Sequence, residues 1–245
     1  MTTSNTSLQF NGVSTEYALA TIQDPNKRFV QYPNTLRLLG NLSGKKVLDI
    51  GCGNGIFTRM MAMQGASIVG YDVSEKQIQK AQQVEEAAGL NIKYFITERF
   101  ESLSEKFDIA TAIMVLICAM DEKQLGNIFA DASSVLYTNG KFICLTLNPD
   151  FKRFGEIICN RRFTKKADDN IDIEFFDDAG KLSFSITDTF FSAAQYEKAA
   201  LENGFTEIKW EKLEISPEGL KEKGVKFWEG YEDDCPYIGL TLSRV

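Results

Sequence analysis

The chain has 245 residues, with 27 Lys and Arg against 34 Asp and Glu, so its formal net charge is −7. This acidity argues against binding to nucleic acids or to anionic membrane surfaces, since both need a basic surface. Histidine is absent, which excludes Ser-His-Asp and Cys-His catalysis and every His-ligated metal site. We therefore predict no metal centre, no nucleic-acid partner and no membrane partner.

The cysteines and the N-terminal residues predict a cytoplasmic protein. Five cysteines form no CxxC pair and are odd in number, a pattern typical of reduced thiols. Residues 1–9 lack the charged and apolar regions of a signal peptide. No apolar run reaches the roughly 18 residues that a membrane-spanning helix needs. The oligomeric state is not indicated by the sequence.

The N-terminal 40 residues predict two short helices. The first covers residues 14–23 and is broken by Asp24-Pro25. The second begins at Pro33, because proline suits the first turn of a helix, and stops near Gly40. We expect residues 1–40 to form a helical lid over a substrate.

The next hundred residues alternate between apolar runs and segments of helical periodicity. The runs predict buried strands and the segments between them predict helices. The expected strands are 46–50, 67–71, 92–96, 107–116 and 141–147, and the expected helices are 56–64, 74–88 and 121–137. Such alternation is typical of βαβ units. It predicts an α/β fold with a doubly wound parallel sheet.

The pattern changes after Asn148-Pro149. Alternating runs at 171–176 and 181–191 predict a β-hairpin around a turn at 177–180. A helix over 192–203 and late strands at 205–213 and 237–242 follow, with a polar stretch at 214–236 between these strands. The whole chain is predicted to be a single domain, in which residues 41–147 form the cofactor-binding half and residues 148–245 the substrate-facing insertion and late strands.

Residues 161–166 (RRFTKK) form a basic cluster. Such a cluster could contact RNA or an anionic substrate. Because the chain as a whole is acidic, we interpret it instead as a solvated loop.

The segment Val47–Gly55 (VLDIGCGNG) places a glycine turn between a strand and a helix. Gly51 and Gly53 have no Cβ, so the backbone can adopt positive φ and approach a ligand closely. A dinucleotide fingerprint would need a third glycine at position 56, which is Ile56. Asp49 would repel a pyrophosphate but would suit an ammonium group. The turn therefore predicts a ligand other than a dinucleotide.

Two further acids follow the second and third strands. The carboxyl ends of neighbouring parallel strands meet at one crevice, so Asp72 and Glu98 are expected near Asp49. Asp72 could accept hydrogen bonds from both hydroxyls of a ribose, and Glu98 from the amino group of adenine. Together the three acids predict a nucleoside that carries an amine, rather than a polyphosphate.

The glycine segment, the segment VGYDVSEKQI (69–78) and Glu98 together resemble the class I S-adenosylmethionine-dependent methyltransferases over residues 46–147. The resemblance implies a Rossmann-like, seven-stranded sheet, S-adenosylmethionine (SAM) as cofactor and a small molecule as substrate. The sequence departs from the family pattern at Glu98-Arg99-Phe100, because in the family the acid usually precedes a small apolar residue. The cofactor contacts that it implies are Asp49, Gly51, Cys52, Gly53, Asp72, Val73, Gln77, Glu98, Arg99, Met114 and Val115.

The C-terminal third adds a second resemblance. Residues 190–210 and 216–240 are similar to methyltransferases of the toxoflavin type, which methylate ring nitrogens of small heterocycles.

Asn148-Pro149-Asp150-Phe151 resembles the Asn-Pro-Pro-aromatic motif of amino-methylating enzymes, but it follows the fifth strand and lacks the second proline. We interpret it as a turn at the pocket mouth. Aromatic residues outside the sheet pattern either belong to the core or stack on a flat substrate. The candidate substrate contacts are Tyr17, Tyr32, Asn148, Phe151 and Trp228.

Without histidine, few side chains remain as a catalytic base. The candidates are Tyr17, Asp188, Glu229 and Asp234, and the reaction also proceeds without a base where the acceptor carries no proton. The predicted function is SAM-dependent transfer of a methyl group to nitrogen or oxygen of a small aromatic or heterocyclic molecule, by in-line displacement. The alternatives are a cofactor-binding protein without catalysis and a methyltransferase that acts on RNA or protein.

Overall fold

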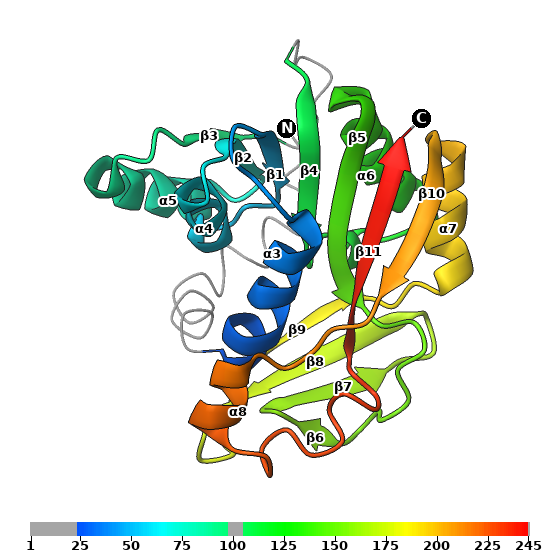
Figure 1. Cartoon of the computed structure of the whole chain (residues 1–245). Helices are drawn as coiled ribbons and strands as arrows, with labels where there is room; N and C mark the ends of the chain where they lie inside the picture. The colour runs from blue at the N-terminus through cyan, green and yellow to red at the C-terminus, as the bar shows by residue number, and fades with distance from the viewer. Residues whose placement is uncertain (1–23, 98–104, 245) are drawn as a thin grey trace.

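The computed structural model describes residues 24–97 and 105–244, and its central feature is a seven-stranded sheet of order β10-β11-β5-β4-β1-β2-β3 (Figure 1). Strands β1 to β5 pair in parallel, and β11 runs antiparallel to β5 and β10. The predicted doubly wound α/β fold is confirmed. The strands are β1 Lys46–Ile50, β2 Ser67–Asp72, β3 Lys93–Ile96, β4 Phe107–Ile113, β5 Leu136–Leu147, β10 Phe205–Glu211 and β11 Tyr237–Arg244.

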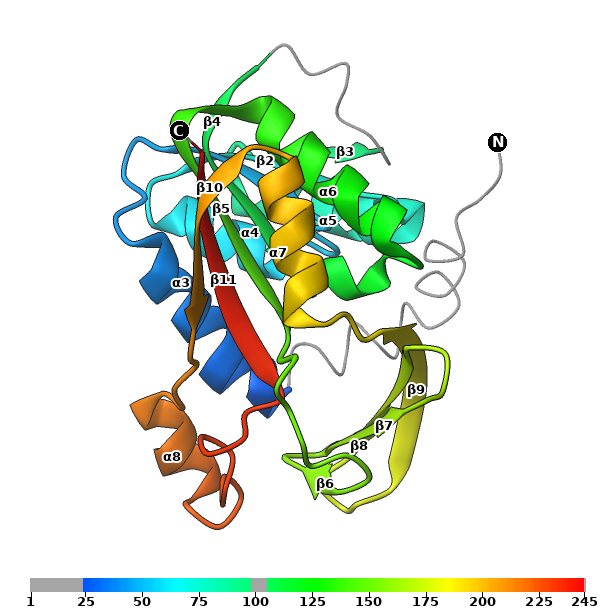
Figure 2. The same cartoon turned by 90° about the vertical axis from the view of Figure 1, so that its right-hand side faces the viewer.

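Helices cover both faces of this sheet (Figure 2). Side chains that alternate along the strands divide between two cores. Val47 of β1 packs in the core that contains Met61 of α4, and Leu48 packs in the core that contains Phe129 of α6. The first face carries α3 Tyr32–Leu39, α4 Ile56–Met63 and α5 Glu75–Ala88, and the second carries α6 Glu122–Val135 and α7 Ala193–Glu202.

Local capping explains where several of these helices begin. Ser74 accepts a hydrogen bond from the Gln77 N–H at the start of α5, and Asp121 accepts one from the Gln124 N–H at the start of α6. Ser192 and Gln195 form a reciprocal capping box at α7. Each such cap stabilises a helix by about 1 kcal/mol, which is why the sequence located these starts correctly.

A second, four-stranded antiparallel sheet of order β6-β7-β8-β9 lies across the carboxyl ends of β4 and β5 (Figure 1). Its strands are β6 Ile157–Ile158, β7 Arg161–Lys165, β8 Asn170–Phe176 and β9 Leu182–Thr189. The predicted hairpin is β8–β9. Ile171, Ile173 and Phe175 on its inner face pack in one core with Leu145 and Leu147 of β5.

The basic segment at 161–166 is not the solvated loop that we predicted, because Arg161–Lys165 is strand β7. Cys159 (φ 47°) and Asn160 (φ 64°) form the two-residue turn between β6 and β7, and two residues at positive φ are typical of a tight hairpin. The Arg161 side chain is buried. It forms a 2.6 Å ion pair with Asp24, and its guanidinium lies 3.9 Å from the centre of the Phe175 ring.

The N-terminal helix begins before Pro33, contrary to the prediction. A helical run starts at Pro25, passes through the π-helical turn η1 (Lys27–Gln31) and continues as α3. Pro33 has no N–H to donate to the Phe29 carbonyl, four residues earlier. The backbone N–H of Ser216 donates to that carbonyl instead, at 2.8 Å. A long-range contact thus allows the helix to continue through proline.

Other boundaries also differ from the prediction: α6 ends at Val135 rather than at 137, and β5 begins at Leu136 rather than at 141. Strand β4 ends at Ile113, because Met114 has φ 59° and the chain then enters the 3-10 turn η2 (Leu116–Cys118). The stretch after β10, predicted only as polar, contains α8 (Pro217–Lys223), which Ser216 caps and which contacts η1. Within the described residues, no helix is both long and apolar enough to cross a membrane.

Candidate active site

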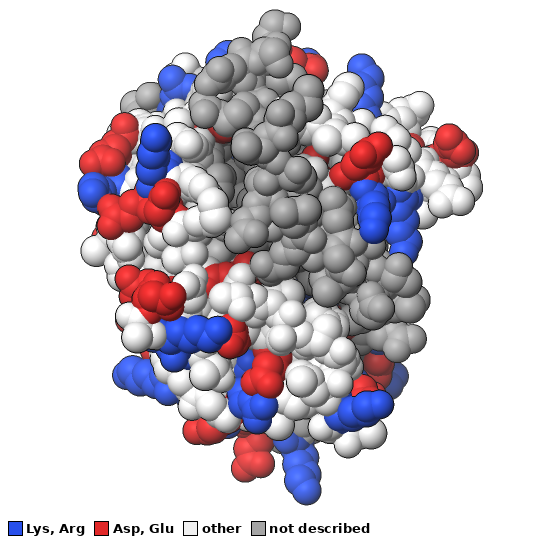
Figure 3. Space-filling model, turned by 180° about the vertical axis from the view of Figure 1, so that it is seen from behind, with Lys and Arg blue, Asp and Glu red and all other residues white. Residues whose placement is uncertain are grey.

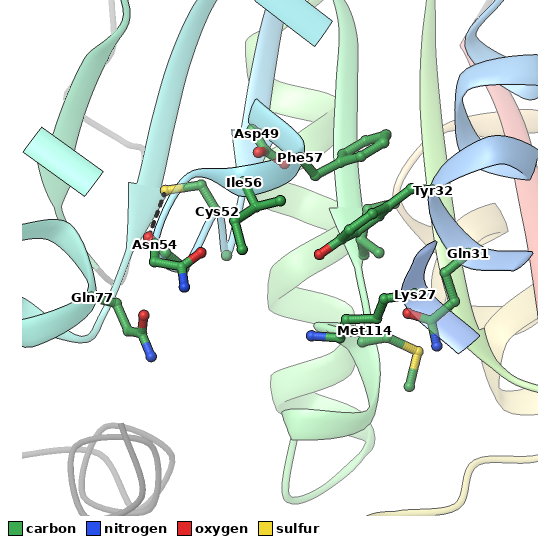
Figure 4. Close-up of a pocket in the computed structure, with 13 residues that line it drawn as sticks. Lys27, Gln31, Tyr32, Asp49, Cys52, Asn54, Ile56, Phe57, Gln77 and Met114 are labelled. Atoms are coloured by element: carbon green, nitrogen blue, oxygen red, sulfur yellow. Dashed lines mark hydrogen bonds between the residues drawn. The ribbon is translucent and has the colours of Figure 1, made fainter. Parts of the chain in front are cut away.

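A pocket opens where the carboxyl ends of β1 and β4 face the N-terminal helical run (Figure 4). It contains about 550 Å³ of empty space, a volume that includes its open mouth. The lining residues are Lys27, Gln31, Tyr32, Asp49, Gly51, Cys52, Gly53, Asn54, Ile56, Phe57, Gln77, Ile113 and Met114.

The glycine loop forms one wall, and glycine is needed there for two reasons. Gly51, Gly53 and Gly55 have φ of 67°, 54° and 75°, a region that other residues rarely adopt. A Cβ on Gly51 would also lie 2.4 Å from Cγ2 of Val115. The glycine therefore allows the segment after β4 to pack directly on the loop, which places Val115 behind the wall and Met114 in the lining.

Asp49 is a buried carboxylate at the base of the pocket, with 3% of its surface exposed. The Thr58 hydroxyl donates to Oδ2 at 2.6 Å and the Thr111 hydroxyl donates to Oδ1 at 2.8 Å. Burial raises the pKa of Asp49 to about 6, against the opposing effect of these two hydrogen bonds. The position suits a cation, which would stabilise the ionised form.

Asp72, at the end of β2, holds the glycine loop to the start of α5. It accepts hydrogen bonds from the backbone N–H groups of Gly53 and Ser74, both at 2.8 Å. Burial raises its pKa. Each carboxylate oxygen retains acceptor capacity after these bonds. Asp72 is outside the lining itself, as is the next residue, Val73, whereas Gln77 on the first turn of α5 belongs to it.

The opposite wall comes from the N-terminal helical run, and sequence reasoning found only part of it. Lys27, Gln31 and Tyr32 line the pocket, and the Tyr32 hydroxyl points into it (Figure 4). Tyr32 stacks on Phe57 with ring centres 5.2 Å apart. Gln31 is 2% exposed, and its buried Oε1 has no hydrogen-bond partner among the described residues. Because the second helix was expected to begin at Pro33, Lys27 and Gln31 were predicted to lie between the two N-terminal helices and were not named as contacts.

The other predicted substrate contacts lie elsewhere. Asn148 fastens a turn, since its Nδ2 donates to the Cys235 carbonyl and its Oδ1 accepts from the Asp150 N–H. Phe151 and Trp228 are 4% and 3% exposed and pack in the core beneath the second sheet. The structure thus brings Tyr32, but not these three residues, to the pocket.

The candidate bases are also dispersed. Glu229 is exposed, and Asp234 accepts from the backbone N–H groups of Lys152 and Arg153. Asp188 lies buried on β9. Tyr17, Glu98 and Arg99 are outside the described residues.

Two further observations concern the charged side chains and the cysteines. Among the described residues, no group of three or more Cys, Asp and Glu side chains could hold a metal ion. On the face in Figure 3, acidic and basic side chains are interspersed, and the described residues form no continuous basic area there.

Comparison with known proteins identifies the family. A methyltransferase domain model matches residues 26–209. A ubiquinone biosynthesis O-methyltransferase of Actinobacillus pleuropneumoniae is 31% identical over 166 residues, which cover 62% of this chain and 70% of that protein. A SAM-dependent methyltransferase of Clostridium acetobutylicum shares the fold with a TM-score of 0.66 at 14% identity, covering 96% and 99% of the two chains. SAM-bound CalS10 of Micromonospora echinaspora, an amino pentose methyltransferase, gives 0.58 at 16% identity, covering 87% and 88%. The chain therefore belongs to the methyltransferase domain family, and it has the fold of SAM-dependent methyltransferases.

Proposed function

We propose that this methyltransferase transfers the methyl group of SAM to nitrogen or oxygen of a small aromatic or heterocyclic molecule. The observation that carries the proposal is the pocket between the glycine loop and the N-terminal helical run, which contains one buried acid and one lysine. SAM has an amino-acid end with one charge of each sign. Asp49 suits its ammonium group and Lys27 its carboxylate.

The nucleoside end of SAM would extend along the loop toward α5. In this arrangement Asp72 accepts from the ribose hydroxyls, beside the two backbone N–H groups that it already binds. Val73 and Gln77 flank the adenine, and Gly51, Cys52, Gly53, Met114 and Val115 surround the rest. Glu98 and Arg99 keep the adenine role that the family resemblance implies.

The chemistry requires alignment more than activation. A sulfonium is already a good leaving group, so the protein's main task is to hold the acceptor atom opposite sulfur, about 3–3.5 Å from the methyl carbon. We place the acceptor on the side formed by residues before 41 and after 147, with Tyr32 as one contact. These segments would also exclude water from the reacting atoms.

The acceptor class has two lines of support. A curated relative is named as an O-methyltransferase of ubiquinone biosynthesis, and residues 190–210 and 216–240 resemble toxoflavin-type enzymes, which methylate ring nitrogens. Methylation of RNA or protein is the second candidate. It would require binding that weakens steeply with salt, whereas the net charge of −7 favours a small acceptor over RNA.

Replacing Asp72 tests the cofactor site. We expect Asp72→Ala to weaken SAM binding at least about 100-fold, because two hydrogen bonds to a charged group contribute about 1.5–3 kcal/mol each. Isothermal titration calorimetry with SAM measures the change. Glu75→Ala, at the exposed first turn of α5, is the matched control and should bind as the wild type does. Equal binding by Asp72→Ala, with an unchanged melting temperature, would contradict the assignment.

The pKa of Asp49 predicts how SAM affinity depends on pH. Its ionised form binds the ammonium group, and its folded-state pKa is about 6. Raising the pH from 5 to 7 should therefore tighten binding about tenfold, with a plateau above pH 7. Asp49→Asn should bind weakly and show no such dependence. A flat profile in the wild type would place the ammonium elsewhere.

A further inference from the structure

Asp188 is a buried acid on β9, outside the pocket lining. It lies directly opposite Ile171 in the β8–β9 pairing, so the two side chains share one face of the second sheet. That face is the apolar inner one, which packs toward β5. Asp188 is 7% exposed, and its Oδ2 has no hydrogen-bond partner in the parts of the chain that the structure describes.

An unpaired carboxylate in apolar surroundings is costly and calls for an explanation. Burial raises the pKa of Asp188 to about 7, and no charged partner within residues 24–97 and 105–244 contributes to the shift. Burial, together with the charge of Asp188, raises the pKa of the Cys118 thiol on η2 and of the Tyr196 hydroxyl on α7, which is bonded to Thr146 at 2.8 Å. On β7, Lys165 has its ammonium 4.9 Å from the ring centre of nearby Phe190. None of these groups donates a hydrogen bond to Oδ2 of Asp188.

The position of Asp188 relates it to the pocket. Strand β9 contacts η2, the short turn that follows the end of β4. Met114, which lines the pocket, precedes this turn, and the Cys118 thiol donates to the Met114 carbonyl at 3.6 Å. Asp188 therefore lies on a strand that contacts the turn directly after Met114, which is what connects it to the pocket.

We propose that Asp188 is the general base of the reaction, and that the acceptor is a neutral aromatic ring whose nucleophilic atom carries an acidic O–H or N–H proton. The inference deepens the proposed function and rests on it. The Asp188 carboxylate removes the proton as a lone pair of that oxygen or nitrogen attacks the methyl carbon. The C–S bond breaks with its electron pair going to sulfur, the C–O or C–N bond forms, and Asp188 later releases the proton to solvent.

The same geometry sets the specificity. A protic acceptor satisfies the free carboxylate oxygen, whereas an aprotic ring nitrogen leaves it unpaired. The apolar inner face, with Ile171, Ile186 and Phe190, favours a flat uncharged ring. A general base contributes roughly 10²- to 10⁴-fold to the rate.

The test compares Asp188→Asn with the wild type on four protic probes and one aprotic probe. The protic probes are catechol, 8-hydroxyquinoline, lumazine and theophylline, the aprotic probe is quinoline, and mass spectrometry measures the gain of one methyl group. We expect Asp188→Asn to lower kcat at least 100-fold on every protic probe that the wild type methylates. The KM for SAM should not change. The wild-type rate should rise with pH to a plateau above about 7. Asp188→Glu should have a kcat between those of Asp188→Asn and the wild type.

Controls separate this inference from the proposed function. Asp172→Asn, on the neighbouring strand where the acid pairs with Lys166, should retain full activity, and any transfer to quinoline should be the same in all variants. The inference is overturned if Asp188→Asn keeps more than half of the activity on a protic probe. It is also overturned if the wild type binds SAM but methylates none of the four. Failure of the wild type to bind SAM would instead overturn the proposed function.

Discussion

Arg161→Met is expected to lower the free energy of unfolding by about 3–5 kcal/mol, because it leaves the Asp24 carboxylate buried without its cation. The two side chains are 5% and 3% exposed and 2.6 Å apart. Of its hydrogen bonds to described residues, the Asp24 side chain would keep only those with Asn26, at 3.0 and 3.3 Å. Urea denaturation at pH 7 measures the loss, and the melting temperature should fall by roughly 10 °C.

A double variant distinguishes a lost charge partner from lost packing. Asp24→Asn combined with Arg161→Met removes both charges and should recover most of the stability. Arg162→Met is the matched control, since that pair with Glu174 is partly exposed and should cost at most about 1 kcal/mol. A loss below 1 kcal/mol for Arg161→Met would show that the pair does not anchor the N-terminal helix.

Asp188→Asn is expected to stabilise the protein at alkaline pH. The folded-state pKa of about 7 is raised from 3.8, so the folded protein binds more protons than the unfolded chain between these values. The stability of the wild type therefore falls as the pH rises from about 4 to 7 and levels off above that. Integrated over the shift, the cost is about 4 kcal/mol.

Denaturation curves at pH 4, 6 and 8 check this prediction. The gain from Asp188→Asn should be largest at pH 8, at about 2–4 kcal/mol, and fall below about 1 kcal/mol at pH 4. Asp172→Asn should show the opposite sign, because its ion pair with Lys166 lowers the pKa of that acid. A pH-independent gain would mean that the pKa of Asp188 is the same in the folded protein and in the unfolded chain. If Asp188→Asn is more stable at pH 8 and also less active, Asp188 is an acid that the protein retains for function at a cost to stability.

The central sheet was predictable because its signals are local. Strand β1 has the predicted bounds, Lys46–Ile50, since an apolar run ends directly at a glycine turn. The same turn located Asp49 and the glycine loop in the pocket. Ser74, Asp121 and Ser192 marked helix starts through hydrogen bonds that span only three residues.

The missed features depend on contacts distant in sequence. Arg161 can be buried in β7 only because Asp24 neutralises it, and no local pattern in RRFTKK indicates that. The helix passes through Pro33 because Ser216 binds the carbonyl that proline leaves free. Trp228 lies in the core rather than over the pocket because its indole N–H donates to the Gly219 carbonyl of α8. Sequence alone could not choose between these two positions for an aromatic residue.

The hydrogen bonds of the Asn26 side chain predict which parts of the chain can be exchanged with a related enzyme. Its side chain donates to the Cys159 carbonyl of the β6–β7 turn and accepts from the Tyr231 hydroxyl of the C-terminal segment, both at 2.9 Å. The N-terminal helix, the second sheet and the segment before β11 thus share one buried amide. Recombination with a related methyltransferase should therefore exchange all three pieces together, because a single foreign piece would leave the others without their hydrogen-bond partners.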